Sequence, residues 1–327
     1  MMDCLFSIIV PHRNIPKLLE RCLHSIPRRP DLQVIVVDDN SDETFSPELK
    51  NLEQVFNPWT FIYVREKGMG AGHARNVGLD AAKGRWLLFA DADDFFVEDI
   101  NDILETYKDA EEDILYFRNL SVLSDNTSKS SHRDDWIDRM IATYNTLKDE
   151  YYIRCNHCVP WGKMLHRAFI TQQRIRFDEV MYSNDVMFGL RTGCQAKEVQ
   201  IIDRPLYVLT ERAGSLTSGF AEKPGELKTR AEVCFRAQSY INGLGEPYAS
   251  RFECMSVAQY MSRMFHQDKS LFASYYPLLS SYYPSYFAAL KQIRLHEKNR
   301  WDKLQLYLYS FWICLKQGFP IFADGTK

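Results

Sequence analysis

Short apolar runs alternate with amphipathic segments along the first 120 residues of the chain. The runs predict buried strands at Leu5–Val10, Val34–Val37, Phe61–Val64, Trp86–Ala90 and Ile114–Phe117. We expect Pro11 to end the first of these strands. Between the runs, apolar positions recur at helical spacing in 16–26, 72–82 and 98–107. Continuous apolar strands that alternate with helices indicate an α/β fold whose mostly parallel sheet is flanked by helices.

Beyond residue 120 the pattern changes twice. Residues 121–135 are polar and serine-rich, which indicates a loop or an excursion between sub-regions. In the mixed stretch that follows, the pattern predicts a turn at 161–163 and a helix at 184–192. It also predicts strand-like pieces at 199–202 and 206–209. From about residue 225 onward the pattern is helical and rich in aromatic residues. The sequence therefore predicts a first domain over 1–222 and a helical C-terminal region over 223–327.

The composition is that of a globular protein. The 327 residues are 46% hydrophobic and 25% charged, with a formal net charge of −3. Proteins that bind nucleic acid non-specifically are usually far more basic, so we expect no nucleic-acid partner. The eight cysteines are dispersed and no secretory signal pattern begins the chain, which favours reduced thiols and a cytoplasmic location. No uncharged apolar run reaches about 18 residues, so we expect no membrane-spanning helix.

Polar side chains gather where three of the predicted strands end. The clusters occupy residues 11–14, 38–41 and 91–94 and read PHRN, DDNS and DADD. Ligands of an open parallel sheet bind outside the carboxyl ends of its strands. Any one cluster is explained as a loop or a helix cap, whereas three clusters at the same edge indicate a binding site.

The DADD cluster places three carboxylates within four residues. Like charges so close repel one another, and a bound cation relieves the repulsion. Carboxylate oxygens and water suit Mg²⁺ or Mn²⁺, whereas a solvated acidic turn needs no metal. Cys155 and Cys158 form a Cys-x-x-Cys pair with no second pair to match it, so two incidental thiols explain them better than a zinc or redox site.

Four strings of the sequence, taken together and in this order, resemble the inverting family-2 glycosyltransferases of the GT-A fold: SIIVPHRN, VIVVDDNSDE, GHARNVGLDAAKGRWLLFADADDFF and YSNDVMF. The resemblance covers about residues 4–217. It implies a GT-A catalytic domain over 1–222, with a Rossmann-like nucleotide-binding half at 1–120 and an acceptor half at 121–222. It also implies an enzyme that moves a sugar from a nucleoside diphosphate sugar, usually a UDP-sugar, to a hydroxyl acceptor.

The resemblance assigns several residues to the nucleotide sugar. Backbone around Pro11 and His12, and the carboxylate of Asp39, would recognise the base, usually uracil, whose ring N–H an aspartate can accept. Arg75 would face the nucleotide or its phosphates, unless it is a surface arginine of its helix. The string ERAGSLT at 211–217 resembles the mobile segment that closes the catalytic domain. Its Arg212 would meet the diphosphate or serve a surface role.

Asp91 and Asp93 match the family's Asp-x-Asp motif, which contacts the ribose and coordinates the metal. Asp94 would share or support that role. The metal, Mg²⁺ or Mn²⁺, would stabilise the departing diphosphate as a Lewis acid.

The string YSNDVMF resembles the acidic motif that begins the family's acceptor-side helix. The usual form has a glutamate before the aspartate, and here Asn184 stands in that place. This departure leaves Asp185 as the base that would deprotonate the acceptor in a single displacement with inversion. The alternative for Asp185 is a favourable position in the first helical turn. Trp161 would form the floor of the acceptor site or belong to the core.

The C-terminal third is basic and aromatic. Residues 271–320 hold six lysines or arginines against two acids, and 304–315 read LQLYLYSFWICL. Such a helix can lie peripherally on an anionic membrane surface, at the inner face of the membrane. The alternatives are a helical layer packed on the catalytic domain and a contact in a homo-oligomer. The resemblance implies a saccharide or lipid-linked saccharide as acceptor, in the synthesis of surface polysaccharide or glycan.

Two other functions compete with the transferase. An oxidoreductase would use the glycine-rich stretch of Gly68, Gly70 and Gly72, but a dinucleotide fingerprint should follow the first strand directly. A non-catalytic sugar-nucleotide binding module would explain Asn184 as a mark of lost activity. The presence of Asp185 argues against that module.

Overall fold

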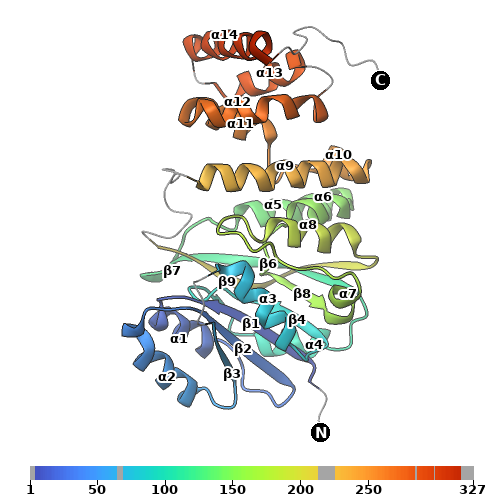
Figure 1. Cartoon of the computed structure of the whole chain (residues 1–327). Helices are drawn as coiled ribbons and strands as arrows, with labels where there is room; N and C mark the ends of the chain where they lie inside the picture. Colours follow the sequence, from blue (N-terminus) through green and yellow to red (C-terminus); the bar gives the residue numbers. More distant parts are fainter. Residues whose placement is uncertain (1–3, 65–68, 213–224, 284–285, 298, 318–327) are drawn as a thin grey trace. The chain divides into compact units, whose positions relative to one another are not determined.

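A computed structural model of the chain describes residues 4–64, 69–212, 225–283, 286–297 and 299–317 (Figure 1). The chain divides into two compact units, Met1–Ala221 and Glu222–Lys327. The boundary that we predict, at residues 222–223, lies outside the described residues. In the described part of the chain, no helix combines the length and the apolar character needed to cross a bilayer.

The first unit alternates strands and helices in its first half. Its strands are β1 (Phe6–His12), β2 (Leu32–Asp39), β3 (Thr60–Val64), β4 (Trp86–Phe89), β5 (Phe95–Phe96), β6 (Ile114–Leu123), β7 (Asn126–Ser130), β8 (Lys163–His166) and β9 (Val199–Glu211). Its helices are α1 (Pro16–His24), the 3₁₀ turn η1 (Glu43–Phe45), α2 (Ser46–Val55), α3 (Ala71–Ala81), α4 (Ile100–Tyr107), α5 (Asp135–Leu147), α6 (Glu150–Asn156), α7 (Arg167–Gln172) and α8 (Val186–Gln195).

The described strands form one nine-stranded sheet in the order β3-β2-β1-β4-β8-β6-β9-β5, with β7 paired to β6. Strands β3, β2, β1 and β4 are parallel, and β6 is parallel to β9. The pairs β4–β8, β6–β8, β5–β9 and β6–β7 are antiparallel. The predicted α/β class is therefore confirmed, and the wholly parallel half of the sheet is the one formed by the first 90 residues.

Pro11 does not end the first strand, contrary to our prediction. Strand β1 continues through His12, where it still pairs with Asp38 of β2. The pairing of β1 with β4 stops at Ile9. Pro11 therefore lies on a stretch that pairs on one side only, where the missing N–H breaks no bond on the open side.

The structure refines two further predictions for the middle of the chain. The polar stretch 121–135 is not a plain loop, because β6 runs to Leu123 and turns into the short antiparallel strand β7, whose residues are all exposed. A strand that faces water on both sides carries no apolar alternation, so the pattern could not reveal it. The pieces at 199–202 and 206–209 belong to one strand, β9, whose register against β6 shifts near Arg118.

Helix α3 carries one edge of the site and packs on β1 and β2. Gly78 of α3 faces Ile9 so closely that an added Cβ would lie 2.4 Å from the isoleucine side chain. In Figure 1, helices α5, α6 and α8 lie together beside β6, away from α1 and α2. The helices therefore cover both faces of the sheet, as the alternation of apolar strands and helices predicts.

The second unit is helical throughout its described residues. Its elements are α9 (Glu226–Leu244), α10 (Tyr248–Arg251), α11 (Val257–Gln267), α12 (Lys269–Tyr275), the 3₁₀ helix η2 (Tyr276–Ser281), α13 (Tyr286–Leu295) and α14 (Arg300–Gln317). Buried Glu297, between α13 and α14, accepts a hydrogen bond from Ser262 Oγ at 2.8 Å and pairs with His266 Nε2 at 2.5 Å. These contacts tie the end of α13 to α11.

Candidate active site

The three predicted polar clusters lie at one edge of the sheet. They follow β1, β2 and β4, which are parallel neighbours, so their carboxyl ends point the same way. The residues between β4 and β5 carry Asp91 and Asp93, and α8 begins directly after Asp185. This edge is the topological position at which an open α/β sheet binds ligands.

The His12 side chain belongs to the scaffold of this edge. Its Nδ1 lies 2.8 Å from Asp38 Oδ1, and its Nε2 accepts the Ile15 N–H at 3.1 Å. The second bond requires a free lone pair on Nε2, so Nδ1 carries the proton and donates to Asp38. Burial alone would raise the pKa of Asp38, but hydrogen bonds from His12 and Ser41 hold it below its ordinary value. Both ring nitrogens of His12 are thus bound within the protein.

Asp39 holds the segment that leads into α3. Its two carboxylate oxygens accept the backbone N–H groups of Met69 at 3.0 Å and Gly70 at 2.9 Å. The side chain is buried, yet each carboxylate oxygen can accept a second hydrogen bond. Two glycines of this stretch have structural roles: Gly70 adopts a positive φ of 91°, and Gly72 packs too closely against its neighbours to carry a side chain. Gly68 lies outside the described residues.

Arg75 is buried rather than exposed, so it is not a surface arginine of its helix. Its Nη1 donates to Asn184 Oδ1 at 2.8 Å and its Nη2 to Asp91 Oδ1 at 2.6 Å. The guanidinium also lies over the Phe177 ring at 5.3 Å. Both terminal nitrogens donate to protein side chains, so the guanidinium fixes Asp91, and its predicted role toward the nucleotide stays a prediction.

Asp91 and Asp93 are held by different partners. The Asp91 N–H donates to Tyr207 Oη at 2.7 Å. The Asp93 carbonyl accepts from Arg21 Nη2 at 2.5 Å and from Thr210 Oγ1 at 2.7 Å. These bonds to side chains of α1 and β9 fix the backbone on which both carboxylates stand.

Arg212 forms an ion pair with Asp93, and its predicted contact with the diphosphate stays a prediction. Its Nε lies 3.3 Å from Asp93 Oδ2, and both side chains are about one third exposed or slightly less. The other residues of its string, from 213 onward, lie outside the described residues. Arg75 and Arg212 thus form an ion pair with one carboxylate each, those of Asp91 and Asp93.

The three aspartates within residues 91–94 repel one another. Burial and the charge of Asp91 raise the pKa of Asp93, against the opposing charge of Arg212. Burial and the charges of Asp93 and Asp91 raise the pKa of Asp94 well above its ordinary value. Asp94 is buried and its Oδ1 accepts the Thr210 N–H at 2.7 Å, so it does not open into the site.

The donor set at this edge fits a hard divalent cation. Asp91 and Asp93 keep about 31% and 27% of their side chains exposed, and they offer carboxylate oxygens of the kind that Mg²⁺ and Mn²⁺ prefer. Burial and, after it, the charge of Asp91 raise the pKa of Asp93, and a bound cation would relieve the repulsion between the two carboxylates. Asp94 contributes to this charge without being placed as a ligand.

Asp185 is the N-cap residue of α8, but its side chain caps nothing: it makes no hydrogen bond to the first-turn N–H groups. The charges of Arg75 and Asp91 act on this carboxylate. Burial raises its pKa, the charge of Asp91 adds to that rise, and Arg75 opposes it. Asp185 therefore lies at the start of α8 without capping it, and a raised pKa is the property that a general base needs.

A stack of phenylalanines fixes α8 against β4. The Phe177 and Phe188 rings stack at 3.8 Å between centroids, and Phe89 meets both edge-on at 5.2 and 5.6 Å. Asn76 of α3 exchanges two hydrogen bonds of 3.0 Å with the Phe177 backbone. Helix α3, the end of β4 and the start of α8 are thus locked together, and with them Arg75, Asp91 and Asp185.

Gly72 gives a first prediction about this locked region. A Cβ at Gly72 would lie 2.1 Å from the Asp178 carbonyl and 2.9 Å from Asn184 Cβ. Gly72→Ala should therefore lower the free energy of unfolding by about 1–3 kcal/mol, because the backbone must move. Gly243→Ala is the matched control, since Gly243 lies in α9 with nothing within 4 Å of its Cβ position; it should stabilise by about 0.5–1 kcal/mol. Urea unfolding of both variants checks this, and equal stability would contradict it.

Trp161 does not form the floor of an acceptor site. It is 7% exposed, stacks on Tyr207 at 5.9 Å and meets Trp136 edge-on at 6.2 Å. A ring enclosed in this way offers almost no face to a sugar, so the core role that we left open is the one observed. Through Tyr207 the ring supports the backbone of Asp91.

Several residues of the site carry no signal in the sequence. Arg21, Tyr207 and Thr210 reach Asp91 and Asp93 across 72 to 117 residues of chain. Arg21 reads as an ordinary polar position of an amphipathic helix, and the other two as strand residues. Asn184 was noticed as a departure from the family string, but its bond to Arg75 follows only from the fold.

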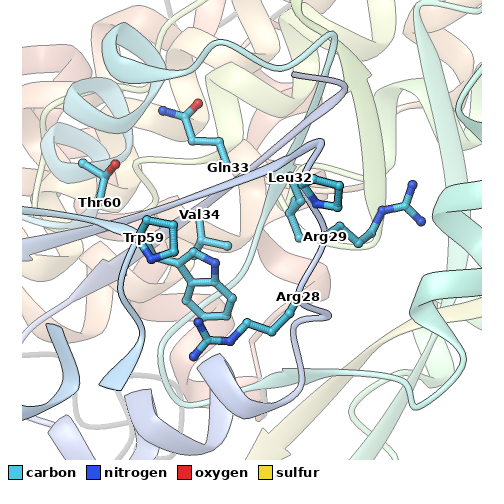
Figure 2. Close-up of a pocket in the computed structure, with 9 residues that line it drawn as sticks. Arg28, Arg29, Leu32, Gln33, Val34, Trp59 and Thr60 are labelled. Atoms are coloured by element: carbon cyan, nitrogen blue, oxygen red, sulfur yellow. The ribbon is translucent and has the colours of Figure 1, made fainter. Parts of the chain in front are cut away.

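A separate pocket lies at the opposite ends of β2 and β3, near the start of each strand. It encloses about 390 Å³ and is lined by Arg28, Trp59 and Gln33 among others (Figure 2). Arg28 caps the end of α2, donating to the carbonyls of Val55 at 2.9 Å and Asn57 at 3.1 Å, and lies 4.9 Å from the Trp59 ring. The Arg28 guanidinium is therefore already bound within the protein. None of the predicted site residues lines this pocket.

Comparison with known proteins identifies glycosyltransferases as relatives of this chain. Residues 7–171 match the family model described as "Glycosyl transferase family 2". Over 224 residues the chain is 26% identical to the uncharacterized glycosyltransferase EpsJ of Bacillus subtilis strain 168, which covers 65% of this chain and 63% of that protein. The match spans between about one third and two thirds of the length of the first curated relatives.

Solved structures of the same fold include two with bound nucleotide sugars. TarS 1–349 of S. aureus, in complex with UDP-GlcNAc, matches with a TM-score of 0.65 at 20% identity, covering 98% of this chain and 95% of that one. The mannosyltransferase PcManGT of Pyrobaculum calidifontis, in complex with GDP-Man and Mn²⁺, matches with a TM-score of 0.51 at 14% identity, covering 98% and 88%. At these identities the likeness establishes the fold.

Proposed function

We propose that this chain, which belongs to glycosyl transferase family 2 and so uses a nucleotide sugar, moves the sugar of a UDP-sugar to an acceptor hydroxyl with inversion. One observation carries the proposal: the Arg75 guanidinium binds Asp91 on one side and Asn184, the residue before the uncapped Asp185, on the other. In this proposal Asp185 is the base and Asp91 and Asp93 form the diphosphate-side motif, at the carboxyl edge of the parallel strands. The complex of TarS with UDP-GlcNAc supports a uridine donor.

The nucleotide base would lie near Asp39 and the backbone of Pro11 and His12. Uracil presents a ring N–H that a carboxylate accepts, whereas cytosine presents a bare ring nitrogen at the same position. The carboxylate of Asp39 is fixed by the Met69 and Gly70 N–H groups, so it is held ready as an acceptor. This arrangement favours a uridine nucleotide over a cytidine nucleotide.

Asp39→Asn should therefore change base preference rather than merely weaken binding. We expect the wild type to bind UDP about 10–100 times more tightly than CDP, the range of one hydrogen bond to a charged group. The asparagine of the variant would offer an amide donor to cytosine, so the ratio should fall toward one. Calorimetric titration with UDP and CDP measures it, with Asp109→Ala as a surface control. An unchanged ratio would contradict a base contact by Asp39.

Asp91 and Asp93 would hold a divalent cation, which when bound supplies Lewis-acid stabilisation of the charge that develops on a departing diphosphate. Arg75 fixes the Asp91 carboxylate, and the carbonyl of Asp93 is held by Arg21 and Thr210. Arg212, beside Asp93, is placed to contribute a further positive charge on the diphosphate side. Such preorganised charges need no rearrangement during the reaction, which is the source of their effect.

Asp185 would take the proton of the acceptor hydroxyl as that hydroxyl attacks the sugar carbon. The new bond forms on the face opposite the departing diphosphate, so the configuration of that carbon inverts in one step. No covalent intermediate with the protein is needed. The raised pKa of Asp185 makes it a stronger base than a solvated aspartate.

The acceptor is a saccharide or a lipid-linked saccharide in this proposal, and the setting is synthesis of surface polysaccharide or glycan at the cytoplasmic side of a membrane. The test is release of UDP from a panel of UDP-sugars with Mn²⁺, compared among wild type, Asp93→Ala and Asp185→Ala. Release by the wild type alone supports the proposal. Nucleotide binding with no turnover, with acceptors present, would instead indicate a binding module.

A further inference from the structure

The outer face of α14 is apolar. Five large side chains of this helix remain about half exposed or more: Trp301 (65%), Leu304 (48%), Leu308 (61%), Phe311 (49%) and Trp312 (48%). In a soluble domain, single exposed apolar residues are common, but a contiguous group of this size usually marks an interaction site.

The spacing shows that the five residues share one side of the helix. Positions 301, 304, 308, 311 and 312 recur at three and four residues, which places them within one face. The opposite side consists of buried residues, among them Leu306 and Ile313, which belong to the core of the second unit. Helix α14 is therefore apolar on both sides, and only one side is covered by the described residues. We call the exposed side the α14 stripe.

Positive charge borders the α14 stripe. Arg300 and Lys316 are exposed on either edge of it, and Lys316 Nζ lies 4.8 Å from the Trp312 ring. Helix α13 adds exposed Lys291 and Arg294. The stripe is therefore bordered by cations of α14 itself, and α13 adds two exposed cations to the same unit.

The acidic side chains of this region are turned away from solvent. Glu297 is buried and already paired with His266 and Ser262. Asp302 is partly buried, and its carboxylate lies close to the Glu297 carboxylate and to a ring nitrogen of His266. Every fully exposed charged side chain in the described part of 291–317 is thus basic.

We propose that the α14 stripe binds the surface of a lipid bilayer that contains anionic lipids. The 18-residue helix would lie in the plane of the interface, with the tryptophans near its two ends at the level of the headgroups. Its basic edges match the negative charge of those headgroups. The inner side of α14 stays in the core of its unit, so binding is peripheral.

Charge complementarity favours a membrane over a second copy of this chain. In a two-fold pairing through the α14 stripe, the same surface patch faces itself. The basic edges of one copy would then meet the basic edges of the other, at an electrostatic cost. An anionic surface meets no such repulsion. This inference rests on the second unit alone and does not depend on the donor or on Asp185.

The test is flotation of the full chain with vesicles of phosphatidylcholine containing about 30% phosphatidylglycerol, and with vesicles of phosphatidylcholine alone. The wild type should float with the anionic vesicles and much less with the neutral ones. Leu304→Gln/Leu308→Gln should reduce the bound fraction at least about tenfold, because two apolar anchors are lost. Both positions are exposed, so the variant should fold, which circular dichroism verifies.

The control variant is Leu147→Gln/Leu244→Gln, which removes two exposed leucines from α5 and α9 instead. It should float like the wild type. Failure of the wild type to float, or equal flotation of the α14 variant, would overturn the proposal. So would light scattering that shows a lipid-free dimer which the α14 variant converts to a monomer, since the stripe would then belong to a second copy.

Discussion

Replacement of Asp185 by asparagine should lower kcat for sugar transfer about a thousandfold, within the range that general-base catalysis usually supplies. The variant removes the proton acceptor while it keeps the size of the side chain. Donor binding should change little, because the Asp185 side chain makes no capping hydrogen bond to α8 whose loss would disturb the site. Steady-state kinetics and UDP titration separate the two effects. Asp125→Asn, in the exposed turn between β6 and β7, is the matched control and should keep wild-type activity.

The stability of this variant separates catalysis from folding. The folded state raises the pKa of Asp185, so it binds that proton more tightly than the unfolded state. The stability gained in this way is fully present below the unfolded pKa and is lost as the pH rises through the folded pKa. Asparagine resembles the protonated form, so Asp185→Asn should match or exceed the wild-type Tm at about pH 7. A large fall in Tm would mean that lost activity reflects unfolding.

The raised pKa of Asp185 should also set the pH dependence of the reaction. The base acts when it is deprotonated, so the rate should fall as the pH drops through the pKa of Asp185. Because burial raises that pKa, the acid limb should lie above the range of about 4 expected for a solvated aspartate. The pH profile of kcat/KM with a UDP-sugar measures the limb. A rate that stays constant down to about pH 4 would contradict a buried carboxyl base.

Asp93→Ala should reduce transfer by a factor of about 100–1000, the usual loss when a group that stabilises developing charge is removed. Treatment of the wild type with EDTA should cause a similar loss, and added Mn²⁺ or Mg²⁺ should restore the activity. The variant should respond to neither addition, since a ligand of the cation is gone. Asp125→Ala should respond to both like the wild type. Full activity of the wild type in EDTA would show that Asp91 and Asp93 act without a metal.

The binding edge of the sheet could be predicted from the sequence because it follows from local pattern. Strands that are buried on both faces are continuous apolar runs, and helices between them force the strands to be parallel. The polar clusters after β1, β2 and β4 must then share an edge. The same reasoning failed for β7, because an exposed strand carries no such run.

Contacts between distant parts of the chain could not be predicted in this way. Arg75 is buried between Asp91 and Asn184, which stands 109 residues away from it in the chain, and neither partner could be predicted from the sequence. Trp161 was left between an acceptor role and the core, and its place was decided by Tyr207 on β9. A side chain's type and helical face limit what it can do, but its partner depends on how strands far apart in sequence pair.

The most direct test of inverting transfer by this site uses water as the acceptor. Wild-type protein is mixed with a UDP-sugar of α configuration and Mn²⁺, and proton NMR follows the anomer of the free sugar as it appears. The proposed displacement predicts that the β anomer forms first and that Asp185→Asn releases it at least about a hundred times more slowly. First appearance of the α anomer, or equal release by the variant, would contradict a single displacement assisted by Asp185.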